Sequence, residues 1–114
     1  MSQLKSKIWV QALIRTAEVG GASAYVMRSG DPDAGTVLVK VSLLDGRAKL
    51  YTAARDFEGH RLWTQPLGVD PAPEQDVDAY TARRHDSDPD IWVIEIEDRQ
   101  GRHFLTEPVE GEGA

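Results

Sequence analysis

The hydrophobic period of this sequence changes at Gly20-Gly21, and this change constrains the fold more than any other feature. Residues 6–19 (SKIWVQALIRTAEV) predict a helix, with Ser6 as its N-cap and the glycine pair as its stop. After the glycines, apolar residues recur at every second position, as in a strand that buries one face. One helix followed by alternating segments is typical of the α+β class.

The alternating segments predict most of the remaining fold. Extended runs bounded by turn residues predict strands at 22–29, 36–44, 48–53, 61–65, 91–97 and 103–105. Asp45-Gly46 favours a tight hairpin, and residues 73–86, which are acidic at their start, predict a second helix on the surface. We expect a mainly antiparallel sheet of five to six strands in the order αββββαββ, whose first four strands form a meander. Residues 1–105 would form a single domain, followed by a flexible acidic tail at 106–114.

Composition excludes several functions. The chain has no cysteine, which excludes thiol catalysis and cysteine metal sites and removes any need for an oxidising compartment. The net charge is -6, and because residues 1–30 hold four basic residues against one acidic residue, the remainder carries -9. Such a body repels a phosphate backbone, so we expect no nucleic-acid partner. No apolar run approaches the roughly 20 residues of a membrane span, and we expect a cytoplasmic protein.

Three stretches resemble a known family. They are IWVQALIR (8–15), GDPDAGTVLVKVSLLDGRAKLY (30–51) and DPDIWVIEIEDRQGRHFL (88–105). Together they are similar to the small bacterial family called domain of unknown function 1491, over residues 4–105. The resemblance implies a stand-alone bacterial single-domain protein. It carries no activity, so no catalytic residue follows from it.

Two of these stretches share an Asp-Pro-Asp turn that precedes a strand. Aspartate at the first turn position accepts a backbone hydrogen bond, and proline at the second presets φ, which explains both turns without any ligand. The alternative is an oxygen-rich site for Mg²⁺ or Ca²⁺ where the two turns converge. Its candidate ligands are Asp31, Asp33, Asp88 and Asp90, with His85 nearby.

Acid–base catalysis has weaker support. His85 lies at a predicted helix end, His103 in a predicted strand and His60 in a loop, and no serine has the spacing of a nucleophile elbow. Glu95 and Glu97 alternate along one strand, which usually marks its solvent side.

The apolar arc of the first helix is wider than one sheet face covers. Either the helix packs in a groove between the sheet and another element, or the surplus faces a second chain. Trp63 is a candidate exposed anchor, because aromatic residues carry much of the energy of interfaces. Ile91 and Val93 make the start of their strand apolar on both faces, so we expect a helix or a partner to cover it. The candidate interaction residues are Trp9, Leu13, Trp63, Ile91 and Val93.

The leading hypothesis is therefore a non-catalytic domain that acts by association with itself or with a protein partner and needs no cofactor. The alternative is a small metal-dependent or acid–base enzyme that uses the Asp/His group with a divalent cation. The sequence indicates neither a small-molecule ligand nor the identity of a partner.

Overall fold

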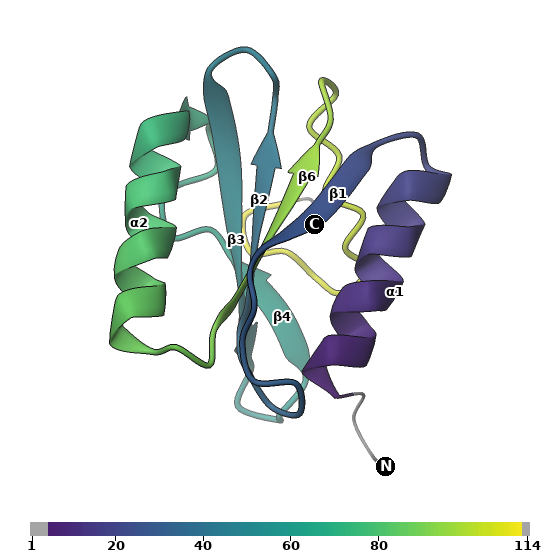
Figure 1. The fold of residues 1–114 in the computed structure, drawn as a ribbon, viewed down its shortest axis with the longest axis vertical. Coiled ribbons are helices and arrows are strands. Elements are labelled where there is room, and N and C mark those ends of the chain that lie inside the picture. The colour runs from purple at the N-terminus through teal and green to yellow at the C-terminus, as the bar shows by residue number, and fades with distance from the viewer. Residues whose placement is uncertain (1–4, 113–114) are drawn as a thin grey trace.

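A central sheet separates two helices that lie on its opposite sides (Figure 1). The computed structural model describes residues 5–112. The elements, in chain order, are α1 (Ser6–Val19), β1 (Ser23–Arg28), β2 (Val37–Ser42), β3 (Arg47–Arg55), β4 (Arg61–Thr64), β5 (Ala72–Pro73), α2 (Glu74–Ser87) and β6 (Trp92–Glu97). The α+β class, the two helices and the predominance of antiparallel pairs are as the sequence predicts. None of the described helices has an apolar stretch long enough to cross a bilayer.

Helix α1 covers the residues that the sequence predicts, but its start is built differently. The N-cap is Lys5, and no side chain caps the helix. Ser6 instead lies buried in the first turn, where its hydroxyl donates a 2.7 Å hydrogen bond to the carbonyl oxygen of Gly35. The prediction of Ser6 as N-cap is wrong because a distant backbone acceptor captures its hydroxyl.

The strand order is β1-β6-β2-β3-β4, with β5 paired to β3. Four pairs are antiparallel, whereas β2 and β6 are parallel neighbours. The predicted four-strand meander is therefore wrong, because β6 lies between β1 and β2. A parallel pair requires a long crossover, and the connection from β2 to β6 includes α2.

The predicted strand at 103–105 is absent. Phe104 has a φ of 61°, which is incompatible with extended backbone. The Phe104 ring instead fills the space above Gly20, where a Cβ would meet it at 2.4 Å. The short strand β5, which the sequence did not predict, brings the number of strands to six.

Each face of the sheet carries its own apolar cluster. On the α1 side, Val10, Leu13 and Ala17 pack against alternate residues of β2 and β6. On the α2 side, Val77 packs against Leu38, Ala48, Leu50, Ile91 and Val93. The two clusters explain why β2 and β6 are almost continuously buried, as is typical of central strands covered on both sides.

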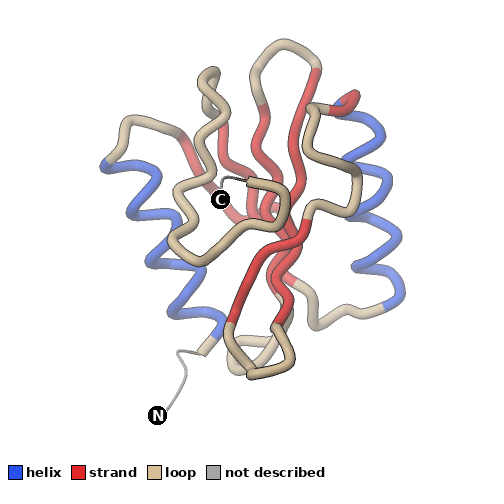
Figure 2. Tube along the Cα trace, turned by 180° about the vertical axis from the view of Figure 1, so that it is seen from behind, coloured by secondary structure: helices blue, strands red, loops and turns tan. Residues whose placement is uncertain are grey.

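The C-terminal segment packs on the domain as far as the structure describes it. Figure 2 shows this loop crossing in front of the strands. The amide of Trp63 donates to Pro108 O at 2.9 Å, the amide of Glu110 donates to Trp63 O at 2.8 Å, and Val109 is buried. The sequence predicts a flexible tail here, whereas these contacts hold residues 108–110 against β4.

Candidate functional site

The two Asp-Pro-Asp turns lie side by side at one end of the sheet, because β2 and β6, which follow them, are parallel neighbours. The amide of Asp31 donates to Asp90 O at 2.9 Å, and Trp92 Nε1 donates to Asp31 O at 2.8 Å. The turns therefore meet through their backbones.

Two of the four carboxylates of these turns, those of Asp31 and Asp88, accept hydrogen bonds from their own loops. Asp31 Oδ2 accepts the amides of Asp33, at 3.1 Å, and Ala34, at 2.8 Å. Asp88 Oδ1 accepts the amide of Asp90 at 3.1 Å. These are the turn hydrogen bonds that the Asp-Pro pattern predicts.

Among residues 5–112, three potential metal-ligand side chains gather within 4.8 Å of one another only at Asp56, Glu58 and His60. That group does not include the predicted candidates, which are Asp31, Asp33, His85, Asp88 and Asp90. Asp56 Oδ1 accepts the amides of Glu58 and His60, both at 2.9 Å, so a tight loop accounts for the grouping.

Two histidines, His85 and His103, make hydrogen-bond contacts with loop residues. His85 Nε2 lies 3.3 Å from the carbonyl oxygen of Ser29. His103 Nδ1 accepts the amide of Leu105 at 2.9 Å, which places the imidazole proton on Nε2, 3.0 Å from Glu112 Oε1. These contacts account for the positions of both rings.

Four of the five predicted interaction residues are buried within the chain, and the fifth, Trp9, is half-buried. Trp63 is 0% exposed, so its prediction as an exposed anchor is wrong. Its ring lies 5.3 Å from that of the half-buried Trp9, and its Nε1 donates to Glu107 Oε1 at 3.0 Å. Leu13 is buried against the sheet, and α2 supplies the cover expected over Ile91 and Val93.

The two edges of the sheet differ in how they are protected. The C-terminal segment covers β4 through hydrogen bonds to both the amide and the carbonyl of Trp63. Strand β1 pairs with β6 on one side, and within residues 5–112 no strand pairs with its other side. Five of its six residues are exposed, including Tyr25 at 44%, Val26 at 37% and Met27 at 38%. An uncovered strand with neighbouring apolar residues is a template for further strand pairing.

One flank of α1 borders this open edge. The buried stripe of Val10 and Leu13 faces the sheet, and Trp9 points toward β4, where it meets Trp63. At about 100° per residue, Lys7, Gln11, Ile14 and Glu18 therefore lie on the opposite flank, on the β1 side. The predicted apolar surplus of the helix is exposed elsewhere, at Ile8 and Val19.

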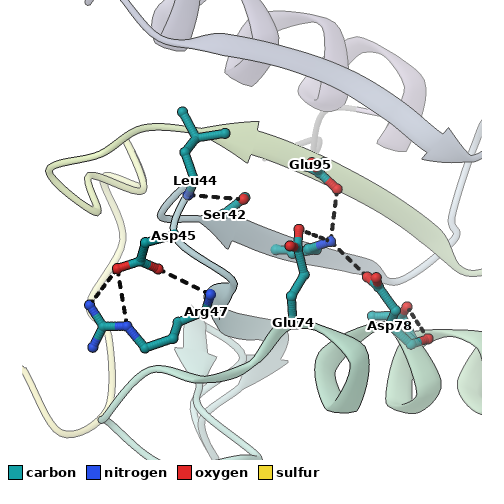
Figure 3. Close-up of polar contacts among 9 residues, drawn as sticks. Ser42, Leu44, Asp45, Arg47, Glu74, Asp78 and Glu95 are labelled. Atoms are coloured by element: carbon teal, nitrogen blue, oxygen red, sulfur yellow. Dashed lines mark hydrogen bonds and ion pairs between the residues drawn. The ribbon is translucent and has the colours of Figure 1, made fainter.

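A buried lysine, Lys40, pairs with three carboxylates, and Figure 3 labels these as Glu74, Asp78 and Glu95. The Lys40 ammonium lies 2.7 Å from Asp78, 2.9 Å from Glu74 and 3.0 Å from Glu95, and the Lys40 side chain is 3% exposed. Helix α2 contributes Glu74 and Asp78, whereas β6 contributes Glu95. One cation thus joins three carboxylates from two elements to β2.

This cluster shifts the pKa of several groups. Burial alone lowers the pKa of Lys40, but hydrogen bonds to Asp78, Glu74 and Glu95 outweigh burial and raise it above its ordinary value. The hydrogen bond from Lys40 lowers the pKa of Glu74. Burial, followed by the hydrogen bond and charge of Glu95, raises the pKa of Tyr25 to about 12. Lys40 therefore stays protonated and anchors α2 to the sheet.

The Lys40 cluster was not predicted from the sequence. The available signal was a charged residue in the middle of each of two apolar strands, Lys40 in TVLVKVSLL and Glu95 in IWVIEIE. Charged residues are almost never fully buried unless they are paired, so two such positions predict a pair.

Comparison with known proteins gives a family but no activity. The family model described as "Protein of unknown function (DUF1491)" matches residues 4–106. The chain is 57% identical to a DUF1491 family protein from Caulobacter crescentus CB15 in a crystal structure, with a TM-score of 0.87, covering 95% of this chain and 100% of that one. An NMR structure of a DUF1491 family protein from the same organism gives 54% identity, a TM-score of 0.85 and coverage of 97% and 100%.

A more distant relative has the same fold. The solution structure of protein Atu0922 from A. tumefaciens is 29% identical, with a TM-score of 0.80, and covers 98% of this chain and 100% of that one. No curated protein matches the sequence.

Proposed function

Because this chain belongs to the DUF1491 family, whose description names no activity, we propose from its geometry that it is a non-catalytic self-association domain. Its β1 edge pairs antiparallel with β1 of a second copy, and the two sheets become continuous across a two-fold axis. The observation that carries this proposal is the difference between the sheet edges, because β4 is covered by the C-terminal segment whereas β1 is open and apolar.

The flank of α1 on the β1 side favours a second copy of this chain as the partner of the β1 edge. A two-fold axis perpendicular to the sheet keeps both α1 helices on one side and makes them antiparallel. Helix α1 has 14 residues and β1 has 6, lengths of about 21 Å and about 20 Å, so an axis through the middle of β1 passes near the middle of α1. Lys7 of each copy then faces Glu18 of the other, and Ile14 lies at the centre.

The regular part of this edge is short. The β1–β6 register shifts between Val26 and Arg28, and such a bulge twists an edge away from further pairing. Regular pairing is therefore confined to residues 23–26. We expect a reversible dimer with a Kd on the order of 10 µM, as for small interfaces.

The cellular setting follows from composition. We place this association in the cytoplasm, because a chain without cysteine needs no oxidising compartment to fold. Its charge of -6 disfavours nucleic acid as a competing partner and weakens self-association at low salt.

Sedimentation equilibrium over a wide concentration range tests whether the chain dimerises through its β1 edge. The variant Val26→Lys places a charge on β1 and is expected to weaken the dimer at least tenfold. The matched control is Phe57→Lys, which replaces a side chain that is 98% exposed in the β3–β4 loop and should leave the dimer intact. A monomeric wild type at millimolar concentration, or equal weakening by both variants, would refute the proposal.

Charge reversal tests the arrangement of the helices. Lys7→Glu and Glu18→Lys should each weaken the dimer, and the double variant should restore it, because the intermolecular pairs are then rebuilt in reverse. Each single change places a charge at the helix end where the dipole favours it, so loss of helix stability cannot explain the weakening. Additive weakening in the double variant contradicts this geometry and favours a different partner on β1.

A further inference from the structure

A cleft of about 310 Å³ opens between the start of α1 and the end of the sheet. Its lining comes from the first residue of α1, the loop before β2, the end of β3 and the start of β4: Ser6, Asp33–Val37, Ala53–Arg55 and Arg61. Ala53 and Ala54 leave the space open because their side chains are small. The volume lies at the lower end of the roughly 300–1,000 Å³ range of ligand pockets.

Arg61 lines this cleft and makes no ion pair with any residue that the structure describes. Its guanidinium lies 5.1 Å from the centre of the Trp9 ring, and the centre of that ring lies 5.3 Å from the centre of the buried Trp63 ring. No described carboxylate lies within ion-pair distance of it, and no described group accepts a hydrogen bond from it. A guanidinium that lies over an aromatic ring keeps its N–H donors available for a planar or tetrahedral oxyanion.

The surroundings of Arg61 also favour an anion. Burial is the main cause of a lowered pKa for Arg61, the charge of Arg55 acts in the same direction, and Glu107 offsets these effects only in part. Helix α1 has no acidic residue in its first turn, so the positive end of its dipole is not offset locally. The one carboxylate in the lining, Asp33, lies 3.6 Å from the ammonium of Lys5.

We propose that this cleft binds a small molecule through a compact oxyanion group, phosphate or carboxylate, which Arg61 holds by paired hydrogen bonds. Arg55, whose guanidinium donates to Gly59 O at 3.0 Å, adds positive potential at the rim. The hydroxyl of Thr36 and the walls formed by the alanines contact the remainder of the ligand. The site is separate from the β1 edge, so it stands whether or not the chain dimerises.

NMR titration with inorganic phosphate, acetate and chloride at equal ionic strength tests the site. The Arg61 Nε–H and Trp9 indole N–H signals are expected to shift saturably with phosphate or acetate and only weakly with chloride. A stronger response to phosphate identifies a phosphoryl ligand, and a stronger response to acetate identifies a carboxylate. Shifts that do not saturate, or that are equal for all three anions, overturn the proposal.

Variants separate this site from general charge attraction. Arg61→Gln should weaken anion binding at least tenfold, and Ala54→Val should weaken it by narrowing the cleft while keeping the arginine. The control is Arg83→Gln, because Arg83 also lies over an aromatic ring, 6.0 Å from that of Tyr80, but on the exposed surface of α2. Unchanged thermal unfolding confirms that the variants fold. Equal weakening by Arg83→Gln, or wild-type binding by Arg61→Gln, contradicts the site.

Discussion

Replacing Lys40 with methionine tests how the buried charge cluster contributes to stability. Methionine has nearly the length and volume of the lysine stem, so the change removes the ammonium while leaving little cavity. The ammonium lies 3.0 Å from Glu95, whose side chain is 6% exposed. Glu74 and Asp78, with side chains 34% and 45% exposed, can turn toward water when the cation is lost.

The expected loss comes almost entirely from Glu95. Removing one partner of a buried ion pair costs about 3–5 kcal/mol, because the remaining charge is uncompensated. The two exposed partners add little, since exposed pairs contribute about 0–1 kcal/mol. We therefore expect Lys40→Met to lower the free energy of unfolding by about 3–5 kcal/mol. At about 4 °C per kcal/mol this corresponds to a Tm about 12–20 °C lower.

Urea unfolding followed by tryptophan fluorescence measures this loss, because Trp63 and Trp92 are buried in the folded chain. Adding Glu95→Gln should recover most of the stability, because a neutral amide costs less to bury than an unpaired charge.

Lys49→Met is the matched control, since Lys49 lies on the neighbouring strand with its ammonium 5.8 Å from the Tyr51 ring. It should cost less than about 1 kcal/mol. A loss below about 1 kcal/mol for Lys40→Met, or a further loss on adding Glu95→Gln, would show that Lys40 does not compensate a buried charge.

Three further predictions concern the core, a glycine and acid stability. Trp63→Ala should lower the free energy of unfolding by about 3–5 kcal/mol in urea titrations, because the ring is 0% exposed. Gly35→Ala should sharply lower the Tm, because its Cβ would lie 2.0 Å from the carbonyl oxygen of Asp90. The side-chain hydrogen bond from Arg102 is the main cause of the lowered pKa of Asp98. The stabilisation that ionised Asp98 gives the fold is therefore present above the ordinary pKa of 3.8, and it is lost as the pH falls through the lower pKa of the folded state. Asp98→Asn should remove this part of the acid dependence, as acid titration followed by circular dichroism would measure.

Local patterns predicted the elements that depend on local physics. Helix α1 occupies the predicted residues because its apolar repeat and the Gly20-Gly21 stop lie within one segment. The core face of β2 was also predictable, since alternation alone places Val37, Val39 and Val41 together. The Asp-Pro-Asp turns were interpreted correctly as backbone turns, because their hydrogen bonds are local.

Errors arose where a distant segment decides the outcome. Trp63 lies in a short strand whose own pattern does not show that the C-terminal segment covers it. The predicted meander failed because strand order depends on which strands bury both faces, and no single strand encodes its neighbours. The Lys40 cluster joins residues 38 and 55 positions apart, so its charges appear isolated along the chain.

Hydrophobic periodicity and turn chemistry predict the helices, most of the strands and the faces that they bury, because both act within a few residues. The position of β6 beside β2, the open edge at β1 and the place of Arg61 in a cleft follow only from the packing of the folded chain. These features depend on long-range packing, in which segments far apart in the chain compete to cover the same surface, and that competition is settled only when the whole chain folds.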